Sequence, residues 1–556
     1  MIKDEIARMV EEAATRAQEA GELPAIALPE IVIERPQRSE HGDYATSLPL
    51  RLARAAQANP LDLGQALVRR LPPSDAVERV EVLPPGFVNF HLSESWLARQ
   101  VDAVLEAGAA FAQAPVGQGQ KVQVEFVSAN PTGPLHAGNG RWAALGSTLA
   151  RVLQAAGYRV ETEYYFNDAG SQVDVFARTL YARYQQLFGR EAPVPEDGYV
   201  GSYMVDLAEQ ARERFGEAML RPQGEPAPEE LGRFGMEQVM DWIRRDLTDL
   251  GVHFDHWYRE QTVYDAGHFD KVMALLREKG LIVEREGAVW FATSQLGADK
   301  DEVVVRSSNL PTYLATDIGY HYDKFFVRDF HRVIDIWGAD HQGHVRPLQL
   351  AAEAMGIQPE RLNIIIGQLV TLRRGEEVLK ISKRSGDIIT LREVMDEVGR
   401  DACLFFFLSR SADAAIDFDL ELAKRQSAEN PVYYVQYAHA RIAGILNHAG
   451  ESALGGGDVA GGDTSLLTHP AELALIRKML LLPELVETIA RTLEPHHLPY
   501  YAQDLATAFH DFYEKCRVVD DDSPELSRAR LKLVAAAQSV LATTLGLMGM
   551  STPDRM

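Results

Sequence analysis

Hydrophobic and polar positions alternate differently in three parts of the chain. In the first part, apolar residues recur at the spacing of one helical face, which predicts an opening amphipathic helix through Ile2, Ile6, Met9, Val10 and Ala13. An irregular α/β stretch follows, in which residues 86–90 predict a short strand after the Pro84-Pro85 turn. The chain becomes rich in Ala, Pro and Gly at 114–119, which indicates a domain boundary.

The middle part begins with a strand, a turn and a helix in immediate succession. Residues 122–127 alternate and are β-branched, 130–134 hold a Pro/Gly turn, and 139–156 have helical periodicity. This order is typical of the start of a nucleotide-binding α/β unit. Strand patterns return at residues 303–305, 333–337 and 364–370, which predicts one sheet assembled across an insertion.

The remaining patterns predict a surface insertion and a helical C-terminal region. Residues 191–230 hold ten acidic and three basic residues with several prolines, which is typical of a surface insertion. After about Val398 the periodicity is helical, and it predicts a bundle formed by residues 433–446, 471–491, 500–517 and 526–545. The glycines between 455 and 462 predict a flexible loop.

These patterns predict a multidomain α/β protein. An N-terminal α/β domain covers residues 1–112. A Rossmann-type parallel-sheet domain covers 113–395, with a surface insertion at about 180–300, and an all-α helical bundle covers 396–556. A length of 556 residues is ample for three such domains.

Composition excludes several classes of protein. With 46% hydrophobic and 24% charged residues, the chain is neither fibrous nor disordered. Two cysteines, Cys403 and Cys516, cannot form a disulfide framework, and no Cys/His cluster has zinc spacing. There is no signal-peptide core and no apolar run near the roughly 18 residues of a membrane span, so we expect a cytoplasmic protein that does not enter the membrane. The formal charge of −24 by itself argues against nucleic acid as a partner.

Two segments carry residues suited to phosphate chemistry. The first, residues 131–139, has His136, Gly138 and Asn139 between a strand and a helix, where helix amides and a donating histidine can hold a phosphate. The second, residues 380–387, has Lys380 and Lys383 three apart among small residues. Alone, each has a simpler interpretation, as a turn with a surface histidine and as a solvated basic loop. Their occurrence together favours a shared site.

The pair resembles the signature motifs of class I aminoacyl-tRNA synthetases, and the closest resemblance is to the arginyl-tRNA synthetase family of bacterial type. It covers nearly the whole chain. The segments that carry it are residues 124–139, 167–170, 311–319, 337–341 and 550–556. Two departures from the commoner motifs are Asn139 in place of a second histidine and Ile381 in place of methionine, and neither removes a required donor or lysine.

The resemblance implies roles for individual residues. As catalytic residues it implies His136, Asn139, Lys380 and Lys383, and as ATP-binding residues these four with Gly138, Gly338 and Ser382. As arginine-binding residues it implies Glu125, Asn130, Tyr313, Asp317 and His341. A guanidinium requires carboxylates and other acceptors, which most of these residues supply. Two simpler alternatives are that Glu125 is a strand-end ion pair and that Asp317 is a helix N-cap.

The flanking domains are expected to bind tRNA. The resemblance places Phe87 and Asn89 against loop bases of the tRNA elbow, and Tyr437, Arg441 and Tyr513 on the anticodon side. Unstacked bases are read by aromatic stacking and edge contacts, which suits these residue types. The alternative is that Tyr437 and Tyr513 only pack the bundle.

The implied activity is that of an arginine–tRNA ligase acting in translation. ATP with Mg²⁺ and L-arginine form arginyl-adenylate, and arginine then passes to the 3′-terminal adenosine of tRNA(Arg). The resemblance further implies that activation requires bound tRNA, that the chain is a monomer, and that no metal is bound by the protein itself. Local charge agrees with this activity, because residues 361–384 carry six basic and two acidic residues despite the acidic total. With few non-specific phosphate contacts, tRNA binding should be moderate and salt-sensitive.

Two other functions were weighed against this one. A cofactor adenylyltransferase would use a similar histidine-containing phosphate site, but those chains are shorter and lack a helical C-terminal region. A catalytically inactive paralogue that only binds RNA would have lost His136, Lys380 or Asp317, and all three are present. Among class I enzymes, a cysteine- or isoleucine-specific member would show zinc ligands or a large editing insertion, and neither is visible.

Overall fold

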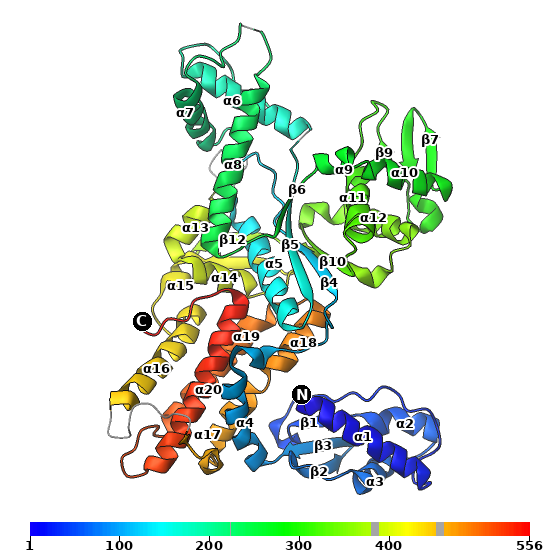
Figure 1. Ribbon diagram of the computed structural model, residues 1–556, viewed down its shortest axis with the longest axis vertical. Coiled ribbons are helices and arrows are strands. Elements are labelled where there is room, and N and C mark those ends of the chain that lie inside the picture. Colours follow the sequence, from blue (N-terminus) through cyan, green and yellow to red (C-terminus); the bar gives the residue numbers. More distant parts are fainter. Residues whose placement is uncertain (169, 223, 380–388, 452–460) are drawn as a thin grey trace.

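The computed structural model describes residues 1–556 apart from 169, 223, 380–388 and 452–460. Its N-terminal part is a small antiparallel sheet of order β1-β3-β2, formed by β1 (Tyr44–Thr46), β2 (Val77–Leu83) and β3 (Phe87–Leu92) (Figure 1). Helices α1 (Ile2–Glu19), α2 (Leu48–Ala56) and α3 (Pro60–Arg70) accompany it. The predicted opening helix and the strand after Pro85 are both confirmed, and α1 buries the expected face, including Ile6 and Val10.

A connecting helix, α4 (Glu94–Ala107), leaves this sheet and packs on the C-terminal bundle instead. It contacts α17 (Pro470–Met479) and α20 (Pro524–Met548), and its Asp102 is paired with Lys532. The range 1–112 predicted as one domain therefore includes a helix whose packing partners lie more than 350 residues away along the chain.

The centre of the molecule is a five-stranded parallel sheet of order β11-β10-β4-β5-β6. Its strands are β4 (Lys121–Glu125), β5 (Arg159–Phe166), β6 (His256–Arg259), β10 (Arg332–Gly338) and β11 (Leu362–Gly367). Strand β4 leads through the Pro/Gly turn into α5 (Ala137–Ala155), so the predicted strand, turn and helix are confirmed. The strands of this sheet carry buried apolar side chains, among them Val122, Val124, Ile334 and Ile336.

Two strand predictions were assigned to the wrong sheet. Residues 303–305 lie in β9 (Glu302–Val305), which pairs with β8 (Ala288–Phe291) and, through it, with β7 (Ile282–Arg285). Val370 begins β12 (Val370–Arg374), which pairs with β13 (Glu377–Leu379) and β14 (Ile416–Asp419). A β-branched run predicts that a strand is buried, but its partners depend on contacts that are distant in sequence.

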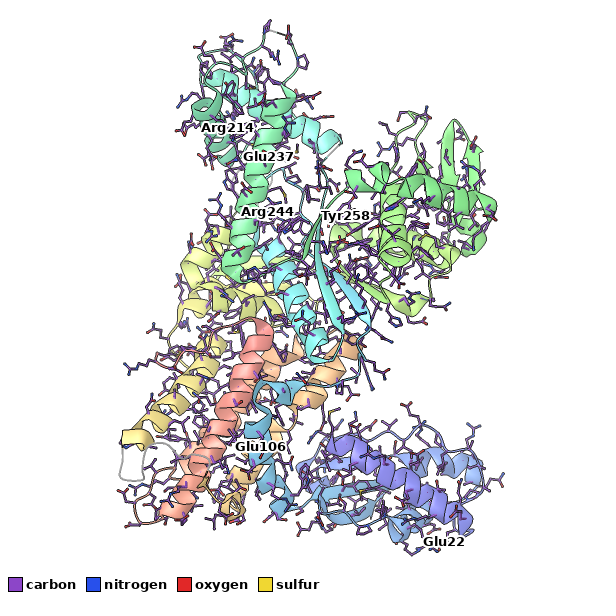
Figure 2. All side chains as sticks on the ribbon, in the orientation of Figure 1. Glu22, Glu106, Arg214, Glu237, Arg244 and Tyr258 are labelled. Atoms are coloured by element: carbon purple, nitrogen blue, oxygen red, sulfur yellow. The ribbon has the colours of Figure 1, made fainter. Side chains whose placement is uncertain are left out.

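The region predicted as one insertion at about 180–300 forms two separate structures. Helices α6 (Ser171–Gln186), α7 (Tyr203–Phe215) and α8 (Glu229–Leu250) make a projecting arm, which carries Arg214 and Glu237 (Figures 1 and 2). The chain then returns to the central sheet as β6, where Arg244 of α8 lies 4.9 Å over the ring of Trp257. The prediction of a single insertion was wrong because this short strand completes the sheet edge.

A second lobe follows β6 and carries the helix that matters most for the site. It contains α9 (Gln261–Asp265), α10 (His268–Glu278), α11 (Tyr313–Tyr322) and α12 (Gln342–Met355), beside the β7-β8-β9 sheet. A π-helical turn, Asp323–Val327, continues α11 directly. The lobe has its own apolar core, which includes Ile318 and Phe325.

The C-terminal part is helical, as predicted, except that strand β14 lies within the range 396–556 predicted as all-α. It contains α13 (Leu391–Val398), α14 (Arg400–Leu408), α15 (Leu420–Lys424), α16 (Pro431–Glu451), α18 (Leu482–Thr492) and α19 (His497–Lys515), together with α17 and α20. The range 471–491 predicted as one helix is two, because Pro483 stands in the first turn of α18 and cannot continue α17. Most of the glycine-rich loop predicted at 455–462 lies outside the described residues.

Helix α20 is the one described helix long and apolar enough to cross a membrane by length and composition alone. Its most apolar stretch is 61% buried inside the bundle, against α4, α16 and α19. Its apolar character is thus explained by its position as a core helix.

Candidate active site

The first predicted phosphate-binding segment forms the start of helix α5. His136 is the N-cap, and the amide of Asn139 donates to its Nδ1 over 3.4 Å, while the amide of His136 donates to Asn139 Oδ1 over 3.0 Å. Since Nδ1 accepts a hydrogen bond, the proton of the neutral ring is on Nε2, which can donate. The Asn139 side-chain amide is likewise left as a donor. Both side chains are therefore pre-oriented to donate beside the positive end of a helix.

Glycines at the start of α5 and at the ends of two strands leave the backbone here accessible to a ligand. A Cβ atom at Gly138 would lie 2.9 Å from Cε1 of His136, so a side chain there would displace the ring. At the ends of strands β10 and β11, Cβ atoms at Gly338 and Gly367 would lie 3.7 and 3.5 Å from the Trp142 indole. Three glycines thus surround one aromatic ring at the carboxyl edge of a parallel sheet, where open α/β sheets bind their ligands.

The second phosphate segment cannot be described directly, because Lys380, Ser382 and Lys383 lie outside the described residues. The residues that follow it are described, and they pair with the first segment. Thr390 forms an antiparallel bridge with His136, and the amide of Leu391 donates to the carbonyl of Leu135 over 2.7 Å. Thr390 and Leu391 therefore lie at the N-terminus of α5.

Arg141, in the second turn of α5, ties this helix to two other segments from inside the protein. Its fully buried guanidinium donates to the carbonyls of Gln368, Ser411 and Ala414, each over 2.7 Å. Burial lowers the pKa of this arginine to about 10. The contacts link α5 to the segment between β11 and β12 and to the segment before β14.

Backbone strain follows directly after strand β4. Val127 and Ser128 have φ angles of 71° and 41°, a conformation that is costly for residues other than glycine. The turn brings Ser128 Oγ to within 3.0 Å of Glu125 Oε1, to which it donates. Asn130, further along, donates to Gln172 Oε1 over 2.7 Å. The strained turn thus orients the carboxylate of Glu125 at the sheet edge.

Glu125 is also a strand-end ion pair, so the two interpretations of this residue are compatible. Its carboxylate is 5% exposed, and its Oε2 lies 2.6 Å from the Nζ of Lys324. Burial raises the pKa of Glu125, and the ammonium of Lys324 opposes that rise.

Asp317 lies inside helix α11, whose N-cap is Thr312, so the N-cap alternative for Asp317 was wrong. Burial, followed by the nearby carboxylates of Glu125 and Glu260, raises the pKa of Asp317 to about 8. Tyr313 begins the same helix, one turn earlier, and is 49% exposed. Helix α11 therefore presents an acceptor and a tyrosine side by side.

Glu260 is a candidate residue that the sequence patterns did not reveal. It follows strand β6, is 8% exposed, and has a pKa raised to about 7, mainly by burial, while the hydroxyl of Thr316 opposes the rise. An acidic residue directly after a strand is a weak signal, and it becomes meaningful only once the sheet order places that strand end near α11.

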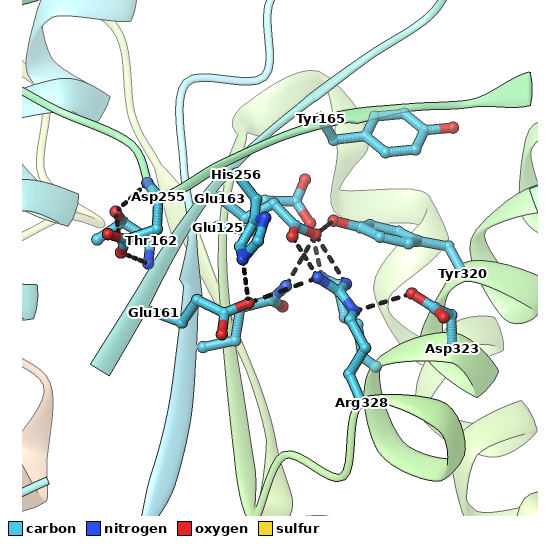
Figure 3. A network of polar contacts seen from close by, with 12 residues as sticks. Glu125, Glu161, Thr162, Glu163, Tyr165, Asp255, His256, Tyr320, Asp323 and Arg328 are labelled. Atoms are coloured by element: carbon cyan, nitrogen blue, oxygen red, sulfur yellow. Dashed lines mark hydrogen bonds and ion pairs between the residues drawn. The ribbon is translucent and has the colours of Figure 1, made fainter. Parts of the chain in front are cut away.

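A larger buried network beneath the site was also not predicted (Figure 3). Arg328 pairs with Glu163 and, over 2.8 Å, with Asp323, and the hydroxyl of Tyr320 donates to Glu163. Asp335 pairs with Lys324 over 2.7 Å, which together with His321 lowers the pKa of Asp335 to about 2 in spite of burial. Charged residues inside otherwise apolar strands were the available signal for this network.

The environment of His341 differs from that of the other residues predicted to bind arginine. It ends a short turn, its side chain is 60% exposed, and its described ring contacts are with Trp337 and His344. Among the described contacts, none joins it to Glu125 or Asp317.

The three residues predicted on the anticodon side do meet. Arg441 donates to the hydroxyl of Tyr437 over 2.9 Å and lies 4.8 Å above the ring of Tyr513. His510 stacks on Tyr437 from the same helix as Tyr513. Two helices, α16 and α19, thus assemble one half-exposed aromatic and cationic cluster.

The N-terminal pair is divided between surface and interior. Phe87 is half-buried at the start of β3, whereas Asn89 is 3% exposed in the middle of that strand. Strand β3 lies between β1 and β2, which leaves the Asn89 side chain buried, and its base contact stays a prediction.

Two cavities lie apart from the residues predicted to form the site. One of about 300 Å³ lies between α18 and α19, lined by residues that include Leu485 and Tyr501, and one of about 280 Å³ adjoins Ser409 and Asp417. Glu494, His496 and His497 lie close enough together to hold a cation, but they are largely surface groups on the bundle. Neither cavity contains a predicted site residue.

Comparisons with known proteins cover the chain in three consecutive parts. Residues 1–92 match the family model "Arginyl tRNA synthetase N terminal domain", 100–413 match "tRNA synthetases class I (R), catalytic domain", and 435–556 match "DALR anticodon binding domain". An arginine–tRNA ligase of Dehalococcoides mccartyi is 53% identical over 100% of this chain and 99% of that protein. Those of Heliobacterium modesticaldum and Syntrophotalea carbinolica are 47% and 44% identical over 100% of this chain, and cover 99% and 100% of those proteins. The Thermus thermophilus arginyl-tRNA synthetase structure has the same fold, with a TM-score of 0.76 at 24% identity over 99% of this chain and 100% of that one.

Proposed function

Because this chain belongs to the arginyl-tRNA synthetase family, we propose how its own residues carry out the reaction of that family. It is a class I ligase that joins arginine to tRNA(Arg). In the first step a carboxylate oxygen of arginine bonds to the α-phosphorus of ATP, and the bond to pyrophosphate breaks. In the second, the 2′ hydroxyl of the terminal adenosine of the tRNA attacks the carbonyl carbon of the adenylate, and AMP leaves.

ATP is proposed to lie over the start of α5 and the ends of β10 and β11. His136 Nε2 and the Asn139 amide would donate to its phosphates, beside the amides of the first helical turn. Gly138 and Gly338 would allow the nucleotide to approach the backbone. Lys380, Ser382 and Lys383 are assigned by resemblance to the same phosphates, and Mg²⁺ would accompany them. These groups position and stabilise charge rather than transfer protons.

Arginine is proposed to bind between strand β4 and helix α11. Its guanidinium would be received by Asp317 and Glu260, with Tyr313 beside them, and its α-ammonium by Glu125, with Asn130 nearby. The observation that carries this assignment is the pair of raised pKa values at Asp317 and Glu260. Burial raises both pKa values, and the carboxylate of Glu260 adds to the rise at Asp317, so a permanent cation bound between them would stabilise their ionised forms.

The tRNA is proposed to contact Phe87 with its elbow and the cluster of Tyr437, Arg441 and Tyr513 with its anticodon loop. Aromatic rings beside a guanidinium suit unstacked bases. We further propose that the protein acts as a cytoplasmic monomer, which sedimentation of the purified chain with and without tRNA would test.

Amino-acid-dependent pyrophosphate exchange tests the arginine site. We expect exchange with arginine and not with the other standard amino acids, and we expect it to depend on added tRNA. Asp317→Asn should raise the KM for arginine at least tenfold and leave the KM for ATP within about twofold, since each lost charged contact is worth roughly 1.5–3 kcal/mol.

The exposed carboxylate of Asp270 on α10 offers a matched control. Asp270→Asn should leave both KM values unchanged. Exchange driven by another amino acid, or equal effects of Asp317→Asn on both substrates, would contradict the assignment.

A further inference from the structure

Lys324 is a fully buried cation that joins two strands and one helix. Its Nζ lies 2.6 Å from Glu125 at the end of β4 and 2.7 Å from Asp335 in β10. These two carboxylates are direct neighbours across the parallel pairing of β4 with β10. The ammonium also lies 4.2 Å from the ring of Tyr320. Without this cation, two buried negative charges would stand side by side.

The position of Lys324 in the chain connects it to the arginine site. It lies in the π-helical turn Asp323–Val327 that continues α11, and this turn points Asp323, Lys324 and Phe325 into the protein. Asp317 lies seven residues earlier on the same helix, roughly 10 Å away at 1.5 Å per residue. A π-turn of this kind inside a helix is rare and frequently occurs at functional sites.

The ion pair therefore fixes the spacing between the two sides of the site. Helix α11 carries Tyr313 and Asp317, and strand β4 ends in Glu125. The contact between Lys324 and Glu125 ties the turn that continues α11 to the end of β4, and so constrains the position of Asp317 relative to Glu125.

Charge compensation of Asp335 alone does not account for the burial of the Lys324 ammonium. Asp335 has a second partner, since its Oδ2 lies 2.8 Å from Nε2 of His321. Glu125, by contrast, has Ser128 on its other oxygen, and within the described part of the chain Lys324 is the cation paired with it. Glu125 thus depends on Lys324 more than Asp335 does.

We propose that Lys324 is a positioning residue of the arginine site, which holds the carboxylate of Glu125 in place relative to Asp317. It does not touch the substrate in this proposal. The inference rests on the proposed assignment of Glu125 and Asp317 to arginine binding. It predicts that loss of the ammonium weakens arginine binding selectively.

The test compares two buried cations of the same network. Lys324→Met should raise the KM for arginine roughly 10- to 100-fold and leave the KM for ATP within about twofold. Arg328→Met is the matched control, since Arg328 follows the same π-turn but pairs with Glu163 and Asp323. It should lower the thermal midpoint and leave the ratio of the two KM values unchanged. An unchanged ratio in Lys324→Met, or the same change in both variants, would overturn the proposal.

A double-mutant cycle separates this proposal from the site assignment. If Lys324 acts through Glu125, the KM for arginine in Glu125→Gln/Lys324→Met should be no higher than in the worse single variant. Additive effects would show that Lys324 acts independently of Glu125. If Glu125→Gln alone leaves arginine KM unchanged, the assignment of Glu125 is wrong, whatever Lys324→Met does.

If the Lys324→Met protein does not fold, the Lys324→Arg variant provides a second test of the proposal. It keeps the charge and changes the reach of the side chain. Equilibrium dialysis with arginine alone should then give binding several-fold weaker than for the unaltered protein, at equal thermal stability. Unaltered arginine binding by a folded Lys324→Arg protein would count against a positioning role.

Discussion

At the scale of single residues, the two carboxylates proposed to receive the arginine guanidinium have raised pKa values. Asp317, with a pKa raised to about 8, is partly protonated at neutral pH when no substrate is bound. Glu260, with a pKa raised to about 7, behaves similarly. A guanidinium stabilises the ionised form of both, so arginine binding must release protons.

The KM for arginine should therefore fall as pH rises. Below the pKa of about 8 the carboxyl of Asp317 is mostly neutral, so each pH unit downward should raise KM by up to roughly tenfold per carboxylate that must ionise. Exchange kinetics between pH 6 and 8.5 measure this, with the KM for ATP as the internal reference. Asp317→Asn should reduce the slope, and an unchanged slope in that variant would assign the dependence to another group.

At the scale of elements, helix α5 carries the first phosphate segment and a buried arginine. Its N-terminus presents His136 and Asn139, and Arg141, one turn further on, binds three carbonyls of the segments that flank β12 and β14. A buried guanidinium whose hydrogen bonds, among the described residues, go to backbone carbonyls is costly, which is consistent with a role in aligning these elements.

Removing this guanidinium should loosen those elements. Arg141→Met leaves the carbonyls of Gln368, Ser411 and Ala414 without their donor, at a cost of roughly 2–5 kcal/mol in stability. We expect a lower thermal midpoint and faster hydrogen exchange in β12 and β14. Arg99→Met, at an exposed position on α4, is the control and should change neither. Unaltered exchange in Arg141→Met would rule out the aligning role.

A second prediction concerns helices α16 and α19. Arg441 links Tyr437 to Tyr513, so Arg441→Ala should disturb the whole cluster. If the cluster stacks on bases, the Kd for tRNA should rise by roughly 5- to 100-fold in filter binding. Arg528→Ala on the exposed side of α20 should have little effect. An unchanged Kd in Arg441→Ala would leave the cluster with a packing role alone.

At the scale of the whole molecule, the N-terminal domain is fastened to the bundle by few polar contacts. Arg35 donates to both carboxylate oxygens of Glu484, over 2.8 and 3.1 Å, and Tyr44 donates to the same group. Arg477 donates to Asp43 over 2.6 Å. Tyr44 is buried beside these charges, and burial raises its pKa.

Glu484→Gln should weaken this attachment. Because a tRNA that touches both domains gains affinity from their fixed spacing, its Kd should rise several-fold while the KM for arginine stays constant. Small-angle scattering of the free protein should show a larger radius of gyration. Glu514→Gln, exposed on α19, serves as control. No change in either measurement would mean that other contacts hold the domain.

The sequence by itself determined the elements and the signature segments of this protein. Helical periodicity marked α1 and the bundle, and the strand, turn and helix around His136 were visible, because these features depend on residues close together in the chain. The tertiary structure alone decided which of them meet. Lys324 reaches Glu125 across 199 residues, Glu260 approaches Asp317 only after β6 joins the sheet, and β9 belongs to a separate sheet. Local patterns of hydrophobic residues predict the type of an element and the face that it buries. Ion pairs and pKa values depend on distances between side chains that are set only when distant segments are brought together.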